Sequence, residues 1–376
     1  MRILIAPDGF KDALPALEVA KAVAAGLRKQ HPLAQYRLFP MGDGGEGTSD
    51  VLIHHQNGQR IECTVDDPLG RPVQAFYGLS QDGQTAYVEM AQASGLQRLQ
   101  QNERNPLYTS THGTGQLLLD AIRRGARHLI LCIGGSATND MGTGMAAALG
   151  HRFADEEGRV IPHPVGEDLG RIAWLDKEQL SFDPSLVRTT VLCDVDNPLY
   201  GPQGAAHVYA AQKGADTAAI DLLDAGMRHL AGRLEVQWGC DVAEHPGAGA
   251  AGGLGAGCLA FLNAELRSGI EVVMAQSRFD EALAWADVVL TGEGRIDGQS
   301  LRGKLIHGIC QRAVQHRVPV VALCGRLDAT DEQIRLIGLQ AAHAISPRSL
   351  PLAEALAATR DNLEKAAATL VKIPGF

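Results

Sequence analysis

The chain has few aromatic residues, no excess of positive charge and no long apolar run. Aromatic residues make up 5% of its 376 residues, and its net charge is −9. Basic stripes with interleaved aromatic side chains bind nucleic acid, so nucleic acid and anionic membrane surfaces are poor candidate partners. The apolar run Arg2–Ala6 ends at Pro7 and is too short for a signal peptide or a membrane span.

Cysteine and histidine are also too sparse or too scattered for two kinds of site. The seven cysteines are odd in number and contain no Cys-x-x-Cys, which argues against a disulfide framework and against structural zinc. The thirteen histidines form no metal-spaced pair on an expected helix. We therefore expect reduced thiols in the core of a cytoplasmic protein.

Short apolar runs alternate with helical patterns along much of the sequence. Arg2–Ala6 predicts a buried strand, and 15–30 predicts a helix with one apolar face. Further strands are expected at 36–39, 128–132, 190–193, 287–290, 318–323 and 341–345. Continuous apolar strands separated by helices indicate an α/β fold, a doubly wound, mainly parallel sheet of Rossmann-like type.

The length favours two domains. We assign 1–65, 108–150 and 285–376 to a discontinuous Rossmann-like domain. A second α/β domain, 66–107 with 151–284, is inserted in it; 62–99 reads as hairpins interrupted by turn residues. A helix at 353–371 is expected to cover the first sheet, and the active site is expected in the cleft between the domains.

Two glycine-rich acidic loops, 41–48 and 291–299, each follow an apolar run. Glycine lets backbone N–H groups approach a phosphate, and neighbouring carboxylates supply the hard oxygen ligands that Mg²⁺ prefers. These loops predict a phosphate and magnesium site. The candidate metal ligands are Asp43, Glu46, Glu293 and Asp297.

A third glycine-rich loop, 134–140, lies between an expected strand and an expected helix. Glycine amides, hydroxyl groups and a helix N-terminus would all face an anion there, although a capped strand-to-helix turn is the simpler alternative. The candidate nucleotide-binding residues are Gly134, Gly135, Ser136, Thr138 and Asn139.

Two other glycine-rich segments match nucleotide-binding motifs, but the residues around them do not fit those motifs. Gly298–Lys304 fits seven positions of a P-loop, but Leu305 stands where Ser or Thr should bind Mg²⁺. Lys304 could still reach a phosphate. Gly247–Gly252 matches Gly-x-Gly-x-x-Gly but follows no apolar strand, so a glycine hinge or close helix packing is the better interpretation.

Charged residues at two further strand ends suggest chemistry. Asp8 and Lys11 follow the first strand, where either could orient a polar substrate. Asp194 and Asp196 follow the strand 190–193, and one of them could act as a general base in phosphoryl transfer to an alcohol. An Asx turn fixed by Pro198 is the alternative.

These residues together resemble the bacterial glycerate kinase family. The resemblance spans essentially the whole chain. It rests on 6–11, 43–48, 68–71, 89–96, 104–107, 113–115, 134–140, 193–199, 201–204, 246–253 and 291–299. The sequence departs from the family pattern at Gly9 and Ala13, where Ser is common, and at Ile306, where Pro is common.

The resemblance implies phosphorylation of D-glycerate to 2-phosphoglycerate with ATP and Mg²⁺. Asp194 resembles the family's catalytic base. We further expect Lys11 to assist catalysis, and Asp8, Arg71 and Arg295 to bind substrate through its carboxylate or the transferred phosphate. Transfer to the 3-hydroxyl, an NAD-dependent hydroxy-acid oxidoreductase and a non-enzymatic nucleotide sensor stay open. The sequence leaves the oligomeric state open, with a homodimer as one option.

Overall fold

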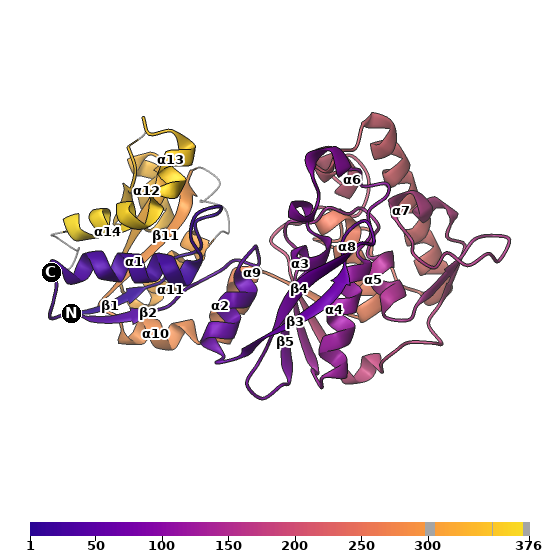
Figure 1. Ribbon diagram of the computed structural model, residues 1–376, viewed down its shortest axis with the longest axis horizontal. Helices are drawn as coiled ribbons and strands as arrows, with labels where there is room; N and C mark the ends of the chain where they lie inside the picture. The colour runs from indigo at the N-terminus through magenta and orange to yellow at the C-terminus, as the bar shows by residue number, and fades with distance from the viewer. Residues whose placement is uncertain (298–304, 348, 371–376) are drawn as a thin grey trace. The chain divides into compact units, whose positions relative to one another are not determined.

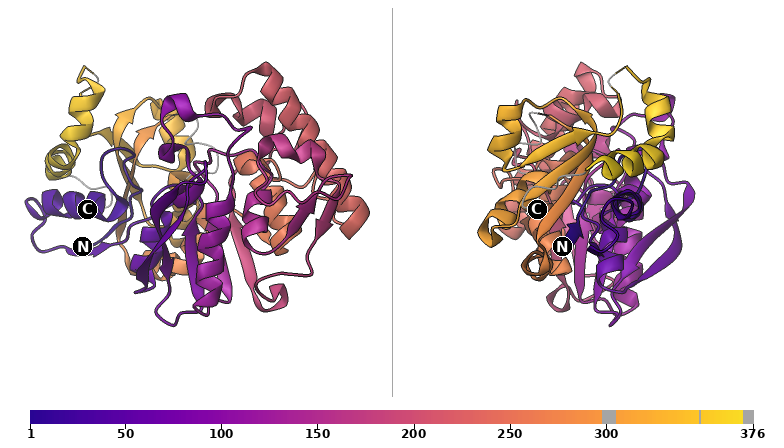
Figure 2. Two further views of the ribbon diagram at one scale, coloured as in Figure 1. Left: turned by 45° about the vertical axis from the view of Figure 1, so that its right-hand side comes forward. Right: turned by 90° about the vertical axis from the view of Figure 1, so that its left-hand side faces the viewer.

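The chain folds into two compact units. The structure, a computed structural model, describes residues 1–297, 305–347 and 349–370. Unit 1 comprises Met1–Asp43 and Ile270–Phe376, and unit 2 comprises Gly44–Gly269. Unit 2 is therefore inserted into unit 1, and the indigo N-terminal strand and yellow C-terminal helices belong to the same unit (Figure 2).

The boundaries of the units differ from those predicted. We assigned 44–65 and 108–150 to the first domain, but both segments lie in unit 2, and 270–284 lies in unit 1. The reason is strand pairing: the strand His128–Cys132 joins Thr85–Glu89 and Arg188–Leu192 in the sheet of unit 2. Alternation along the sequence predicted that strand without identifying its sheet.

Unit 1 contains a five-stranded parallel sheet with the order β13-β12-β11-β1-β2. Counted along this unit the order is 2-1-3-4-5, the flavodoxin-like doubly wound arrangement, and the α/β prediction is confirmed. Ile3, Leu4 and Ile5 are fully buried, as expected for a strand covered on both faces. The strands are β1 (Arg2–Ile5), β2 (Gln35–Leu38), β11 (Val288–Ile296), β12 (Val320–Leu327) and β13 (Ala341–Ala344).

Helices cover this sheet through apolar faces. Helix α1 (Ala16–Arg28) buries Val19, Val23 and Leu27, and it packs against α14 (Thr359–Thr369) (Figure 1). A Cβ on Gly26 would lie 2.2 Å from the carbonyl oxygen of Glu364, so this glycine permits the close approach. The other helices are α9 (Gly269–Ser277), α10 (Phe279–Trp285), α11 (Leu305–His316), α12 (Asp331–Ile337) and α13 (Leu352–Ala357).

Unit 2 contains a six-stranded mixed sheet with the order β10-β9-β6-β5-β4-β3. The predicted hairpins are present as antiparallel β3–β4 and β4–β5 pairs, whereas β5, β6, β9 and β10 run parallel. A separate hairpin pairs β7 with β8. The strands are β3 (Gln59–Asp66), β4 (Pro72–Leu79), β5 (Thr85–Glu89), β6 (His128–Cys132), β7 (Arg152–Ala154), β8 (Trp174–Asp176), β9 (Arg188–Leu192) and β10 (Glu265–Arg267).

Helices of unit 2 surround its parallel strands. Leu117, Leu118 and Leu254 lie in the core cluster that packs on the sheet. No helix in the part of the chain that the structure describes is long and apolar enough to cross a membrane. The helices are α2 (Thr48–His55), α3 (Ala91–Ser94), α4 (His112–Arg123), α5 (Thr143–Ala148), α6 (Ala205–Tyr209), α7 (Thr217–Trp238) and α8 (Ala250–Leu262).

Two local predictions were wrong. The strand expected to end at Leu290 continues to Ile296, so Glu293 and Arg295 lie in β11 rather than in a loop. Gly292 suits the strand because a Cβ on it would lie 2.2 Å from the carbonyl oxygen of Leu323 in β12. The single helix expected at 353–371 is two helices, α13 and α14, separated at Ala358.

Candidate functional site

Parallel pairing brings the carboxyl ends of three strands of unit 2 side by side. Glu89 pairs with Cys132, and Cys132 pairs with Leu192, so β5, β6 and β9 end level with one another. The glycine loop 134–140 follows β6, and Asp194 follows β9. Ligands of parallel α/β sheets collect beyond the carboxyl ends of the strands, which makes this edge a candidate site.

The loop after β6 presents a row of backbone donors. Gly135 has a φ of +77°, a conformation that glycine adopts without strain. The Leu96 amide donates to the Gly135 carbonyl at 2.9 Å, and the Ala137 amide donates to the Ser94 carbonyl at 3.0 Å. Across residues 1–297, 305–347 and 349–370, no group accepts a hydrogen bond from the amides of 134–136. Successive amides without protein acceptors form a nest suited to an anion.

A buried lysine holds this loop from within unit 2. The Nζ of Lys213 donates to Ser136 Oγ at 2.7 Å and to the Thr138 carbonyl oxygen at 2.6 Å. Lys213 is only 2% exposed. Burial lowers the pKa of Lys213 to about 7, and the charge of Asp140 opposes that shift. No sequence motif drew attention to this residue.

Asp140 anchors the far end of the loop. Its carboxylate is fully buried and accepts from the Thr111 amide and Thr111 Oγ1, both at 2.7 Å. It also accepts from the amides of Gly142 and Gly144 at 3.2 Å. Burial raises the pKa of Asp140, whereas these donors lower it. Because Thr111 and Gly142 precede α4 and α5, Asp140 ties the loop to the start of both helices.

Two loop side chains are buried without a partner. Thr138 and Asn139 are fully buried, and neither Thr138 Oγ1 nor the two polar atoms of the Asn139 amide makes a hydrogen bond to any residue that the structure describes. An unsatisfied buried polar atom costs about 1–3 kcal/mol. A polar ligand that satisfies them would recover part of that free energy, which fits a binding loop.

Asp194 lies at the adjacent strand end. Its carboxylate is exposed, and its Oδ1 accepts from the Gly269 amide at 2.9 Å. Gly44 also lies here, because a Cβ on it would be 3.0 Å from Leu192 Cβ and 3.4 Å from Gly269 Cα. The neighbouring Gly45 approaches the glycine loop, with its Cα 3.5 Å from the place of a Cβ on Gly134. Asp194 and the glycine loop therefore flank one edge of unit 2.

The glycine string at 247–253 packs against both loops instead of forming a dinucleotide site. A Cβ on Gly252 would lie 1.9 Å from the Thr138 carbonyl oxygen, and one on Gly249 would lie 2.2 Å from the Pro198 carbonyl oxygen. Gly252 and Gly253 also have positive φ, at +72° and +83°. No strand directly precedes the string. These glycines allow close packing, which is one of the two interpretations that the sequence favoured over a dinucleotide site. The string therefore offers no support for an oxidoreductase.

Unit 1 has its own group of acids at the strand ends. The β1/β11 pair is the topological switch point of its sheet, and the Asp8 amide donates to the Gly292 carbonyl there at 2.8 Å. Burial raises the pKa of Asp8 well above its usual range, and the negative charges of Asp43 and Glu293 raise it further. Asp43 and Glu293 therefore disfavour a negative charge on Asp8 at this edge.

The four predicted magnesium ligands come from both units. In unit 1, Asp43 and Glu293 lie near Asp8, and Asp297 Oδ2 is 3.3 Å from Arg295 Nε; the exposed Glu46 belongs to unit 2. Within the described ranges, no three His, Cys, Asp or Glu side chains are close enough together to hold a metal ion. The acids of unit 1 still have the chemistry that Mg²⁺ prefers, because all are carboxylates.

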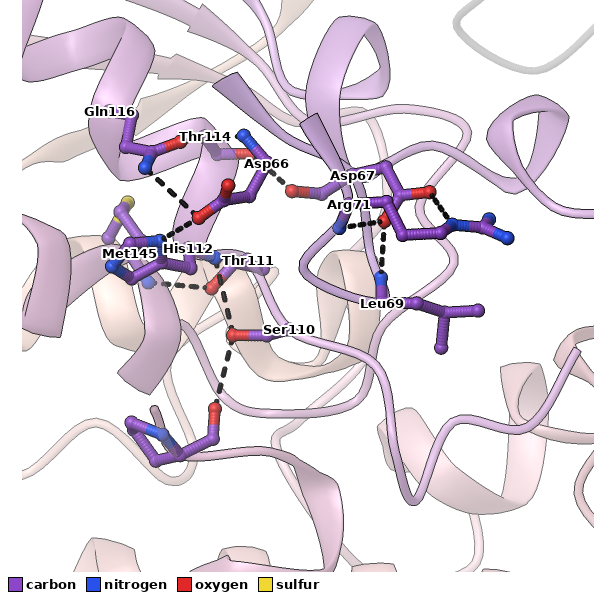
Figure 3. A network of polar contacts seen from close by, with 12 residues as sticks. Asp66, Asp67, Leu69, Arg71, Ser110, Thr111, His112, Thr114, Gln116 and Met145 are labelled. Carbon is purple, nitrogen blue, oxygen red and sulfur yellow. Dashed lines mark hydrogen bonds and ion pairs between the residues drawn. The ribbon is translucent and has the colours of Figure 1, made fainter. Parts of the chain in front are cut away.

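The predicted substrate cations have different surroundings. Arg71 makes ion pairs with Asp67 at 2.6 Å and Glu103 at 2.5 Å, and Figure 3 shows its guanidinium beside Asp67. Arg295 pairs with Asp328 at 2.9 Å, and Lys11 is exposed. Lys304 and the P-loop-like run lie outside the described residues.

Figure 3 also shows how unit 2 fixes the start of α4. His112 Nδ1 lies 2.9 Å from Asp66 Oδ2, which also accepts from Gln116 at 3.0 Å. The Met145 amide donates to Thr111 Oγ1 at 2.9 Å. Because Thr111 in turn donates to Asp140, this polar network supports the glycine loop from the side of α4.

Comparisons with known proteins agree across the whole chain. The model of the Glycerate kinase family matches residues 3–374. A glycerate kinase of Halalkalibacterium halodurans is 47% identical over 100% of this chain and 98% of its own length. A glycerate 2-kinase of Escherichia coli is 42% identical, over 97% and 96%. A crystal structure of a candidate glycerate kinase 2 from Salmonella typhimurium LT2 matches with a TM-score of 0.89 and 41% identity, covering 99% of this chain and 97% of that one.

Proposed function

Because the chain belongs to the glycerate kinase family, we propose that it transfers the terminal phosphoryl group of ATP to the 2-hydroxyl group of D-glycerate in the presence of Mg²⁺. One observation carries the proposal. The amides of 134–136, which donate to no group among the described residues, and the carboxylate of Asp194 follow neighbouring parallel strands, β6 and β9, at the same edge of unit 2. A phosphate cradle thus lies next to a proton acceptor.

The loop after β6 is the proposed nucleotide-binding element. The amides of Gly134, Gly135 and Ser136 would donate to phosphate oxygens of ATP. Thr138 Oγ1 and the Asn139 amide, which are buried and make no hydrogen bond within the described part of the chain, would complete the polar contacts. These donors suit phosphoryl transfer, in which catalysis consists mainly of positioning and of stabilising charge on the transferred group.

Asp194 is the proposed general base. The Gly269 amide orients its carboxylate, and the exposed position leaves room for a substrate hydroxyl group. Asp194 would take the hydroxyl proton as the new O–P bond forms and the bond between the terminal phosphorus and ADP breaks. The proton thus passes to the carboxylate, and the leaving electron pair stays on ADP.

Acids and cations of the strand edges complete the proposal. When bound, Mg²⁺ would neutralise phosphate charge, and Asp43, Glu46, Glu293 and Asp297 are the carboxylates that could hold it, directly or through water. Substrate contacts are proposed for Asp8, Lys11, Arg71 and Arg295. Arg71 would have to bind substrate while its Asp67 and Glu103 partners are present. We place the enzyme in the cytoplasm, where its seven free thiols stay reduced.

The choice of the 2-hydroxyl group rests on the Escherichia coli relative that is called a glycerate 2-kinase. Purified protein with ATP, Mg²⁺ and D-glycerate should release ADP only when glycerate is present. Adding enolase to the same reaction should then give phosphoenolpyruvate without a phosphoglycerate mutase. If phosphoenolpyruvate required the mutase, the product would be 3-phosphoglycerate. If no glycerate-dependent ADP were released, the proposed activity would be wrong.

A further inference from the structure

Lys213 is a buried cation that no step of the proposed mechanism uses. It ends the short 3₁₀-helix Ala211–Lys213, and Gly214 follows it with a φ of +97°. A Cβ on Gly214 would lie 2.1 Å from the Arg104 carbonyl oxygen, so the backbone is packed tightly here. Fully buried lysines are rare because removing an ammonium group from water is costly. Its position therefore calls for a compensating role.

The hydrogen bonds of Lys213 fix the orientation of the Ser136 hydroxyl group. An ammonium group only donates, so Ser136 Oγ must accept the 2.7 Å bond. The hydroxyl hydrogen of Ser136 is then available to a different acceptor. No acceptor for it exists among the residues that the structure describes. A phosphate oxygen on the loop would supply one.

The charge of Lys213 also matches an anion on the loop. The opposing charge that acts on it is that of Asp140, whose oxygens already accept from Thr111, Gly142 and Gly144. Burial lowers the pKa of Lys213 to about 7, so the free protein holds this charge weakly. A phosphate bound at 134–136 would favour the charged ammonium group.

We infer that Lys213 is a positioning residue for the phosphates of ATP, which holds Ser136 as a donor toward the nucleotide and Thr138 in the loop, and supplies positive charge behind them. The inference rests on the proposed function, because it assigns the loop to phosphate. Lys213 acts through Ser136 and Thr138 and does not itself touch the nucleotide.

Lys213→Met and Lys213→Gln separate charge from tethering. Methionine removes both the charge and the donors, whereas glutamine keeps an N–H donor without the charge. We expect Lys213→Met to raise the KM for ATP and the Kd for ADP, measured by calorimetry, by about 10–100-fold, as for loss of a charged hydrogen bond. The KM for D-glycerate should change less than about 2-fold, and Lys213→Gln should lie between wild type and Lys213→Met.

A double-mutant cycle tests whether Lys213 acts through Ser136. Ser136→Ala should raise the Kd for ADP, and adding Lys213→Met to it should raise the Kd by less than the product of the two single effects. Lys177→Met, at an exposed lysine of the same unit, is the matched control and should leave the Kd unchanged. Circular dichroism melting of each variant reports any general loss of structure.

Three results would overturn the inference. The first is unchanged ADP affinity in Lys213→Met. The second is an equal loss of ATP and D-glycerate parameters together with a large fall in melting temperature. The third is full additivity with Ser136→Ala. If Lys213→Met does not fold, the same measurements on Lys213→Gln test the inference. Wild-type protein that binds no ADP would refute the proposed function itself, which separates the two failures.

Discussion

The two sheets carry opposite chemistry at their carboxyl edges. In unit 1, Asp8, Asp43 and Glu293 crowd negative charge at the switch point, and the pKa of Asp8 is raised. In unit 2, amides of the glycine loop and a buried ammonium group gather donors, and the pKa of Lys213 is lowered. The acids of unit 1 suit a cationic ligand, and the donors of unit 2 suit an anionic one. Similar parallel strands can thus prepare sites for opposite ions by the choice of loop residues.

The exposed acid on the donor-rich edge of unit 2 gives the sharpest test. Asp194→Asn keeps an oxygen that can accept from the Gly269 amide but cannot take a proton at neutral pH. We expect kcat to fall by about 10²–10⁴-fold, the usual contribution of a general base, with little change in the Kd for ADP. Glycerate-dependent ADP release measures kcat. Asp196→Asn, two residues away and also exposed, is the control. Near-normal turnover in Asp194→Asn would show that Asp194 is not the general base.

Asp140, the buried acid of unit 2, should stabilise the fold, whereas the acids of unit 1 are proposed to bind ligands. Asp140→Asn would place an amide N–H against one of the backbone donors that the carboxylate now accepts. We expect unit 2 to lose about 3 kcal/mol of its free energy of unfolding. Hydrogen–deuterium exchange of α4 and α5 reports the change. Asp241→Asn, at an exposed aspartate, should have no effect. Unchanged exchange would show that the four hydrogen bonds do not anchor the loop.

The sequence predicted the edges better than the side chains behind them. The sequence correctly placed Gly134–Asn139 and Asp194 at strand ends, because glycine and acids there directly follow apolar runs. Lys213 was not predicted, because its hydrogen bond to Ser136 joins residues 77 positions apart and its sequence neighbours form no motif. The extent of β11 was missed because Gly292 and Gly294 suggest a loop, although close packing on β12 requires a glycine at 292. Periodicity reports which residues face a core, and tertiary pairing decides which strands share a sheet.

Acid should weaken unit 2 through His151. This imidazole is 5% exposed beside Trp238 and Phe261, and burial lowers its pKa from 6.5 to about 4. Between those values the unfolded chain binds the proton more readily, so stability is lost as pH falls from 6.5 toward 4. At a pH of about 4.5 the loss is about 2.5 kcal/mol relative to neutral pH. His151→Phe should flatten this dependence in exchange measurements on α7. An unaltered acid profile would place the sensitive group elsewhere.

The stability of unit 1 should show the opposite dependence on pH. Because the folded-state pKa of Asp8 is raised, the unfolded chain releases this proton first, and stability falls as pH rises through that window. Asp8→Asn should stabilise unit 1 at neutral pH without Mg²⁺, because the amide carries no charge for Asp43 and Glu293 to repel. It should also reduce the rise in melting temperature that Mg²⁺ produces in the wild type. Asp12→Asn is the exposed control. Equal Mg²⁺ responses in the wild type and Asp8→Asn would contradict a cation role for this edge.

The insertion of one unit into the other has a consequence for synthesis on the ribosome. Unit 2 is continuous from Gly44 to Gly269, so all its strands emerge before the second part of unit 1. Strand β1, made first, can pair with β2 but has no partner on its other side until β11 is translated from residue 288. At ~5–20 residues per second, the apolar strand 3–5 waits about 14–57 s for that partner. The earliest segment of the chain is therefore among the last to fold, and during that interval it is a natural target for chaperones.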